Sequence, residues 1–208
     1  TSQVAGLLEG AAPCREDDAP RPNLLFTSGT TGRPKGTELP PTMFAAGKTI
    51  GEHVARLAQS PFAKAGTHLI SGSRSLAGGT PLVILGRFDA EAVLRATHEY
   101  QCGSSVMVPT HFVRLLQLPD EVKRKYDVSS MKLLSHTGAK CPVDVKRRMI
   151  EGFGPVLMDA YGATEVGTTC SINSVDWLRF PGSVGRPVPP FEALIVDEMS
   201  QNPVLEEV

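Results

Sequence analysis

The sequence has few of the features that mark several common classes of protein. Its four cysteines, Cys14, Cys102, Cys141 and Cys170, are scattered over 208 residues, and none has the spacing of a zinc knuckle or a redox pair. The five histidines form no pair with metal-ligand spacing. No apolar run reaches the length of a membrane span, and the N-terminus lacks the basic start and apolar stretch of a secretory signal. Reduced thiols in a cytoplasmic protein are therefore expected.

Neither sign of charge predominates. Lysine and arginine number 21 and aspartate and glutamate 22, which gives a formal net charge of -1. A nucleic-acid partner usually leaves a basic excess, so none is expected. With 41% hydrophobic and 21% charged residues, the composition is that of a globular protein. The length allows one domain with a sizeable core, or two small ones.

Short apolar runs alternate with longer amphipathic ones from residue 23 onward. The preceding segment 1–22 ends in a charged, proline-rich stretch and is interpreted as a linker. Strands are predicted at 23–27, 67–71, 81–85, 104–108, 132–135, 155–158 and 193–196. Helices are predicted at 42–59, after Asp89 as N-cap, from Pro109 onward and at 142–153. This alternation predicts an α/β fold with layered, largely parallel sheets flanked by helices.

Two stretches depart from this alternation. Only nine residues (GSRSLAGGT) separate the strands predicted at 67–71 and 81–85. A parallel crossover needs about a dozen residues or more, so either these strands are antiparallel or residues are missing between them. Residues 199–208 (MSQNPVLEEV) resemble a different segment joined on as a tail.

A glycine-rich segment, TSGTTGRPKG at 27–36, follows the first predicted strand. Glycines allow backbone N–H groups to approach a ligand closely and to form a nest for anions, while hydroxyls add donors and Lys35 adds a full positive charge. The segment therefore suits a polyphosphate. It is not a P-loop, because Pro34 stands where the second glycine is required, and it lacks the spacing of a dinucleotide fingerprint. A surface turn of chance composition is the alternative interpretation.

A second motif, YGATEVG at 161–167, follows the strand predicted at 155–158. Tyr161 offers a flat aromatic face for a base, and Gly162 removes a side chain where a ligand passes close. Thr164 offers a hydroxyl to a phosphate oxygen. Glu165 offers a carboxylate oxygen to Mg²⁺, which proteins hold with one or two carboxylates plus substrate phosphates. Alone, the motif is equally well explained as a capped helix start.

Together, the two motifs resemble the signatures of the adenylate-forming superfamily, which comprises acyl-CoA ligases, firefly luciferases and peptide-synthetase adenylation domains. The resemblance implies that the first motif embraces the β- and γ-phosphates of ATP. It also implies that Tyr161 packs on adenine, Thr164 contacts the α-phosphate and Glu165 helps to hold Mg²⁺. SHTGAKCP at 135–142 resembles the stretch bordering the adenine and acyl pocket. The implied nucleotide-binding residues are Thr27, Ser28, Gly29, Thr30, Thr31, Gly32, Lys35, Gly138, Ala139, Asp159, Ala160, Tyr161, Gly162 and Thr164, with Lys35, Thr164 and Glu165 as catalytic residues.

The flanking sequences resemble fatty acyl-CoA ligases most. The implied reaction activates a fatty acid or similar carboxylate with ATP and Mg²⁺, and transfers it to coenzyme A. Residues 23–198 would form the nucleotide- and acyl-binding part of the large N-terminal domain, and a homodimer is compatible with this assignment. Three alternatives stay open: a luciferase-like enzyme, a noncatalytic nucleotide-binding module, and an unrelated kinase or NTPase.

The sequence also departs from the family pattern. Ser-Gly-Ser-Arg at 71–74 replaces the aromatic-His pair that gates the acyl site in this family. The ribose-binding Asp, the hinge and the small C-terminal domain with its catalytic Lys are not recognisable. A chain that ended at Val208 is therefore expected to have poor or no catalytic activity.

Several other residues are weaker candidates. His111 is interpreted as a partly buried histidine, with the acyl channel as the alternative. His136 is equally consistent with packing and with lining the nucleotide pocket. Trp177 and Phe180 are expected to pack, the run 146–148 (KRR) to form a solvated helix face, and Cys141 to be no nucleophile.

Overall fold

The computed structural model describes residues 17, 24–27, 35–38, 52, 67–69, 81–197 and 199. Within these residues, the strands form a two-stranded and a seven-stranded sheet. The small sheet is an antiparallel hairpin of β1 (Leu24–Thr27) and β2 (Lys35–Glu38). The first predicted strand, at 23–27, corresponds to β1.

The seven-stranded sheet contains the rest of the described strands. In chain order they are β3 (His68–Leu69), β4 (Leu82–Val83), β5 (Ser104–Met107), β6 (Leu133–His136), β7 (Leu157–Ala163), β8 (Gly167–Asn173) and β9 (Arg186–Pro187). Their spatial order is β4-β3-β5-β6-β7-β8-β9. Pairing is parallel from β4 to β7 and antiparallel from β7 to β9. The predicted α/β fold is thus confirmed, with a sheet that is mixed rather than uniform in direction.

The helices between these strands are α6 (Ala90–Tyr100), α7 (Pro109–Leu116), α8 (Asp120–Lys123), α9 (Val143–Phe153) and α10 (Ser174–Arg179). Helices α6 to α9 lie between parallel strands, whereas α10 lies between the antiparallel strands β8 and β9. The Asp89 carboxylate accepts a hydrogen bond from the Ala92 N–H at 2.8 Å, which caps α6 as predicted. Pro109 occupies the first turn of α7, where its missing N–H costs nothing.

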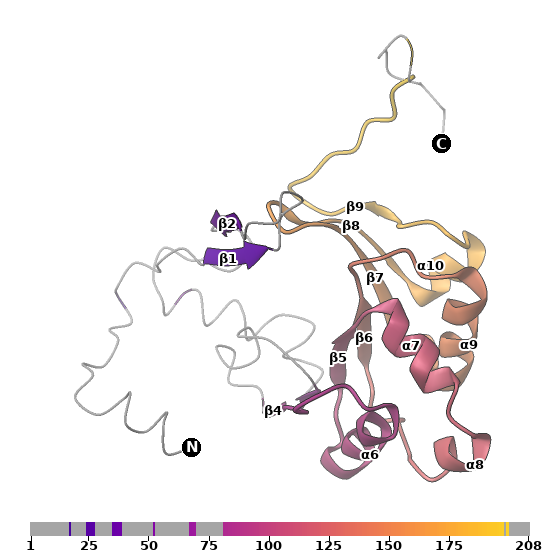
Figure 1. The fold of residues 1–208 in the computed structure, drawn as a ribbon. Coiled ribbons are helices and arrows are strands. Elements are labelled where there is room, and N and C mark those ends of the chain that lie inside the picture. Colours follow the sequence, from indigo (N-terminus) through magenta and orange to yellow (C-terminus); the bar gives the residue numbers. More distant parts are fainter. Residues whose placement is uncertain are drawn as a thin grey trace.

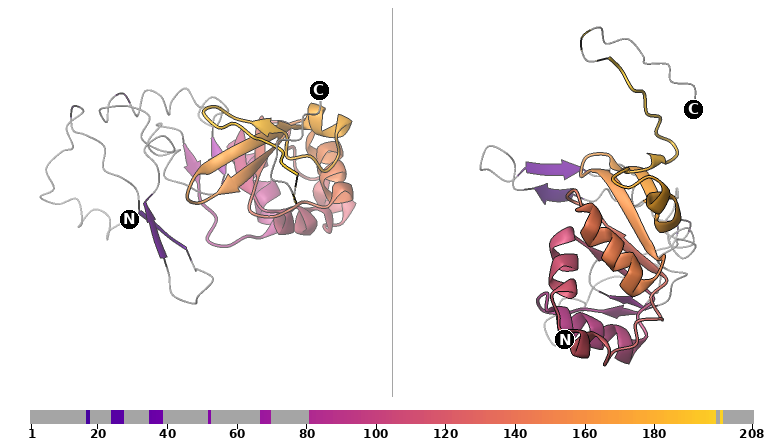
Figure 2. Two further views of the ribbon diagram at one scale, coloured as in Figure 1. Left: turned by 90° about the horizontal axis from the view of Figure 1, so that it is seen from above. Right: turned by 90° about the vertical axis from the view of Figure 1, so that its right-hand side faces the viewer.

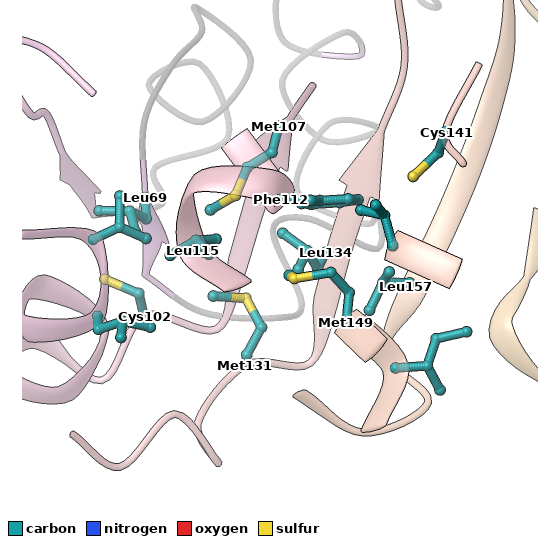
Figure 3. Packing of buried hydrophobic residues seen from close by; sticks show 14 of the residues in the cluster. Leu69, Cys102, Met107, Phe112, Leu115, Met131, Leu134, Cys141, Met149 and Leu157 are labelled. Atoms are coloured by element: carbon teal, nitrogen blue, oxygen red, sulfur yellow. The ribbon is translucent and has the colours of Figure 1, made fainter. Parts of the chain in front are cut away.

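The core lies between the sheet and the helices on one of its faces. Figure 1 shows α7, α9 and α10 on the same side of the sheet, and the right-hand view of Figure 2 shows α7 beside α9. Met107 and Leu134 point from the strands toward Phe112 and Met149 of these helices (Figure 3). All four are at most 1% exposed. Burial of each such side chain contributes about 1.5–3 kcal/mol relative to leaving it exposed. Among the described residues, no helix combines the length and apolar character needed to cross a bilayer.

The structure corrects two expectations about strands. β3 and β4 pair in parallel, so the antiparallel alternative for these strands is wrong. The strand predicted at 81–85 is shorter than expected, and residues 70–81 lie between β3 and β4, which is about the length that a parallel crossover requires. Residues 193–196 form no strand: only Val196 makes an isolated bridge, and the segment runs away from the sheet in Figure 1.

Other predictions fall largely outside the described residues. Of the helix predicted at 42–59, only Glu52 is described, and it is helical. Of the segments 1–22 and 199–208, only Asp17 and Met199 are described, so the proposed linker and tail stay predictions.

Candidate active site

The glycine-rich motif connects the two strands of the hairpin. Thr27 pairs with Lys35, so these residues mark the ends of the segment that joins β1 to β2. The intervening predicted residues, Ser28, Gly29, Thr30, Thr31 and Gly32, lie outside the described residues, and so does Pro34. Their contact with phosphates stays a prediction.

A cavity of about 450 Å³ lies at the carboxyl ends of β6 and β7. We call it the site cavity. It brings together six of the residues predicted to contact the nucleotide: Gly138, Ala139, Asp159, Ala160, Tyr161 and Gly162. The remaining lining residues are Thr137, Lys140, Cys141, Trp177, Gly182 and Val184. Ligands of α/β sheets commonly bind at the carboxyl ends of the strands, so this location suits a binding site.

Sheet register explains why two separated sequence segments meet at this cavity. β6 and β7 are parallel neighbours, with His136 opposite Asp159. The residues that follow each strand therefore emerge side by side. Gly138 adopts φ 85°, a left-handed conformation that other residues rarely adopt. This conformation turns the chain away from β6, toward the helix α9.

The second motif forms the end of β7 and the turn into β8 rather than a helix start. Tyr161 is 57% exposed, so its ring is available to a ligand. Thr164 and Glu165 lie in the turn after β7, where Thr164 is half-buried and Glu165 is exposed. Neither lines the site cavity. Two of the three predicted catalytic residues therefore lie in the turn that follows the cavity-lining part of β7.

Gly162 has a structural reason in addition to the predicted ligand contact. A Cβ at this position would collide with the carbonyl oxygen of Gly167 and lie 2.7 Å from its carbonyl carbon. The pairing of β7 with β8 shifts register between Tyr161 and Gly162, which marks an irregularity in the ladder. A glycine is therefore required by the close approach of β8.

A buried charged cluster lies directly behind the cavity, where the sequence predicted a solvated helix face. Lys146 is 1% exposed, and its Nζ lies 2.9 Å from Oδ2 of Asp159 and 4.6 Å from the centroid of the Trp177 ring. The prediction is wrong for Lys146, although Arg147 and Arg148 are exposed. Its partner lies thirteen positions later in the chain, so the KRR run gave no sign of it. The available signal was spacing, since Lys146 falls on the buried face of α9 with Val145, Met149 and Ile150.

His136 lies under the cavity and does not line it. Its side chain is 0% exposed, and its Nε2 is 3.3 Å from Asp159 Oδ2 without the alignment of a hydrogen bond. Burial lowers the pKa of His136 to about 4, against the opposing effect of Asp159, so the ring is neutral at pH 7. The ring packs edge-on against Phe112, with centroids 5.4 Å apart. Of the two interpretations of His136, the structure supports packing.

The other weak candidates have distinct environments. The half-buried ring of His111 stacks on Phe88 with centroids 3.9 Å apart, and whether it faces an acyl channel stays a prediction. Trp177 is buried as predicted and also forms part of the cavity wall, whereas Phe180 is 60% exposed. Burial raises the pKa of the Cys141 thiol to about 11, which agrees with the expectation that it is no nucleophile.

The site cavity combines groups suited to a ligand with a flat ring and a negative charge. Tyr161 supplies an aromatic face, and the exposed ammonium of Lys140 supplies a positive charge at the rim. Asp159, 15% exposed, adds a hydrogen-bond acceptor.

A second cavity of about 340 Å³, between α7 and α9, contains none of the predicted site residues.

Similarity to known proteins extends over most of the chain. The family model described as AMP-binding enzyme matches residues 9–208. The 4-coumarate–CoA ligase-like 8 protein of Arabidopsis thaliana is 32% identical over 189 residues, which cover 84% of this chain and 33% of that protein. The luciferin 4-monooxygenase of Nipponoluciola cruciata is 30% identical over 185 residues, with coverage of 84% and 33%.

A solved structure shows the same fold. The amide bond synthetase McbA from Marinactinospora thermotolerans superimposes with a TM-score of 0.68 at 23% identity, covering 89% of this chain and 38% of that one. The chain spans about a third of the length of the curated relatives that it matches.

Proposed function

Because this chain belongs to the AMP-binding enzyme family, we propose that it is the nucleotide-binding part of an ATP-dependent acyl-CoA ligase. The substrate is a fatty acid or a similar apolar carboxylate, and the acceptor is coenzyme A. The observation that carries the proposal is the site cavity, which unites residues 138–139 and 159–162 in one wall.

The proposed reaction has two steps. A carboxylate oxygen attacks the α-phosphorus of ATP, and the bond from that phosphorus to the bridging oxygen breaks, which releases pyrophosphate. The thiolate of coenzyme A then attacks the acyl carbon and displaces AMP. The first step gathers negative charge around the phosphates, so it requires fixed positive charge and hydrogen-bond donors there. In this chain, Lys35, the amides of the glycine-rich motif and the Thr164 hydroxyl are the proposed donors, and Tyr161 is the proposed platform for the base.

The described residues fit a metal that arrives with the nucleotide better than a resident metal. Within that part of the chain, no group of three or more His, Cys, Asp or Glu side chains converges as a metal site. Glu165 is a single exposed carboxylate in the turn after β7. One carboxylate together with substrate phosphates is a common way of holding Mg²⁺. Mg²⁺ bound there would neutralise phosphate charge, and Glu165 would orient it.

The choice of acyl-CoA ligase rests on the relatives and the flanking sequence. A 32% identical relative is named as a CoA ligase-like protein, which supports coenzyme A as acceptor. A luciferase-like enzyme is the second candidate, because a luciferin 4-monooxygenase is 30% identical over nearly the same length. Both candidates share the adenylation step and differ in the fate of the acyl-adenylate.

Product analysis tests the proposal. The complete ligase of which this chain is proposed to be the nucleotide-binding part is incubated with ATP, Mg²⁺, coenzyme A and a mixture of fatty acids, and the products are identified by mass spectrometry. The proposal expects AMP, pyrophosphate and acyl-CoA, and the acyl-CoA masses report the preferred chain length. ADP or free phosphate would indicate a kinase or NTPase instead. ATP binding with no acid-dependent product would indicate a noncatalytic nucleotide-binding module.

A variant tests the role of Glu165. In the complete protein, Glu165→Ala should abolish acid-dependent exchange of pyrophosphate into ATP, since losing one such electrostatic contact typically costs about 10²–10³ in rate. Glu121→Ala in α8 is the matched control, because Glu121 is also exposed and lies outside the proposed site. Exchange near the normal rate in Glu165→Ala would contradict the Mg²⁺ assignment.

A further inference from the structure

Lys146 does not line the site cavity, yet it contacts two residues that do. Its Nζ lies 2.9 Å from Oδ2 of Asp159, on β7, and donates a hydrogen bond to it. The same ammonium lies 4.6 Å from the ring centroid of Trp177, on α10. One side chain from α9 therefore joins two parts of the cavity wall that come from different elements.

Stability alone is a poor explanation for this buried ion pair. Lys146 is 1% exposed, and burial lowers the pKa of its ammonium against the opposing effect of Asp159. Removing a cation from water is costly, and well-packed apolar residues are often as stabilising as a buried ion pair. The neighbouring Met149 and Ile150 already provide apolar packing on the same face of α9. The ion pair therefore has a role besides stability, which an apolar side chain at position 146 could not fill.

The geometry around Asp159 indicates that the contribution is orientation. Lys146 and His136 both approach the same oxygen, Oδ2, at 2.9 and 3.3 Å. His136 lies opposite Asp159 in the β6–β7 register. The carboxylate is thus held by a hydrogen bond from the Lys146 ammonium, while the His136 ring, which makes no hydrogen bond to it, occupies the space beside Oδ2. The Asp159 side chain is still 15% exposed, and Asp159 lines the cavity.

Fixing Asp159 also fixes the wall around it. Asp159 and Tyr161 are two residues apart on β7, and side chains at this spacing project to the same face of a strand. Both residues line the cavity, as does Trp177. A displaced Asp159 would therefore alter the wall on which a nucleotide base is proposed to lie.

We propose that Lys146 is a positioning residue for nucleotide binding, which acts through Asp159 to hold the site cavity in its binding shape. This inference rests on the proposed function, because the ligand is taken to be a nucleotide. Lys146 itself touches no ligand in this scheme.

The test measures AMP affinity in the chain as it is. Calorimetry gives the dissociation constant of AMP, and the emission of Trp177, the only tryptophan of the chain, reports on the cavity wall. Lys146→Met should weaken AMP binding about tenfold or more, the loss expected when a charge-assisted hydrogen bond no longer holds its acceptor. It should also change the Trp177 emission before AMP is added. Arg147→Met, a neighbouring exposed position on α9, should change neither.

A double-mutant cycle separates positioning from general destabilisation. If Lys146 acts through Asp159, Lys146→Met should weaken AMP binding little further in an Asp159→Asn background. Far-UV circular dichroism checks that each variant is folded. Lys146→Met alone could fail to fold, because it leaves Asp159 buried without its cation. In that case Asp159→Asn is compared with the double variant. If Lys146 acts through Asp159, these two variants must bind AMP equally.

The outcomes distinguish the two proposals. Absence of AMP binding by the unmodified chain would refute the nucleotide site and this inference with it. Normal AMP binding by the unmodified chain and by folded Lys146→Met would leave the proposed function intact and refute the role of Lys146. Additive losses in the cycle would refute the action through Asp159.

Discussion

Replacing Gly162 with alanine should destabilise the fold, because β8 leaves no room for a side chain there. The added Cβ would collide with the carbonyl oxygen of Gly167, lie 2.7 Å from its carbonyl carbon and lie 3.0 Å from the Cα of Thr168. All three neighbours are backbone atoms, so no side chain can turn aside. Overpacking typically costs about 1–3 kcal/mol, and a backbone obstacle favours the upper value, about 3 kcal/mol. For a chain of this length, that corresponds to a fall in Tm of about 6–12 °C.

Urea unfolding followed by circular dichroism measures this effect. Gly152→Ala is the matched control, because a Cβ at Gly152 meets no atom within 4 Å and this residue lies near the end of α9. The control should leave the free energy of unfolding unchanged or raise it by up to about 1 kcal/mol. If Gly162→Ala unfolded at the same urea concentration as the unmodified chain, the close approach of β8 would not be the reason for this glycine.

Individual contacts support three further predictions. Asp89→Ala should lower the free energy of unfolding by about 1 kcal/mol in urea titrations, because it removes the α6 cap. His136 has a folded-state pKa of about 4 against an ordinary value of 6.5, so the unfolded chain binds the proton first as pH falls. The stability that the neutral His136 contributes is then present above about pH 6.5 and lost toward pH 4, and the free energy of unfolding falls by about 2 kcal/mol between pH 7 and pH 5. His136→Gln should remove this fall. An unchanged pH dependence of unfolding in that variant would contradict the prediction. Cys141, whose thiol pKa burial raises to about 11, should be alkylated at pH 8 only after unfolding, as read by peptide mass spectrometry.

Sequence alone predicted the elements whose signals are local. The cap at Asp89 and the proline at the start of α7 depend only on nearby residues, and both helices begin as expected. β8 was not predicted, because the polar run GTTCSIN has neither a clear alternation nor an apolar stripe. It becomes a strand by pairing with β7, which is a tertiary effect. The segment 193–196 shows the converse, since its four apolar residues form only an isolated bridge, at Val196.

The candidate site also has residues that the sequence predicted and residues that only the fold brings together. Residue chemistry indicated Tyr161 and Gly162, the family resemblance indicated Gly138, Ala139, Asp159 and Ala160, and the β6–β7 register brings all six to one cavity. Lys146 was missed because its partner is set by the fold, and a lysine in a basic run is usually solvated. Burial of a lysine requires a carboxylate that only the folded structure brings close.

The short strand β9 has a consequence for how molecules of this protein meet one another. It is the last strand of the described sheet beyond β8, and it contains only Arg186 and Pro187. An open sheet edge is a template on which a second chain can add a strand, and such addition is a common start of aggregation. Proline offers no N–H to an incoming strand, and arginine brings a charge that a growing sheet would have to bury. This edge should therefore resist the addition of a strand from a second molecule.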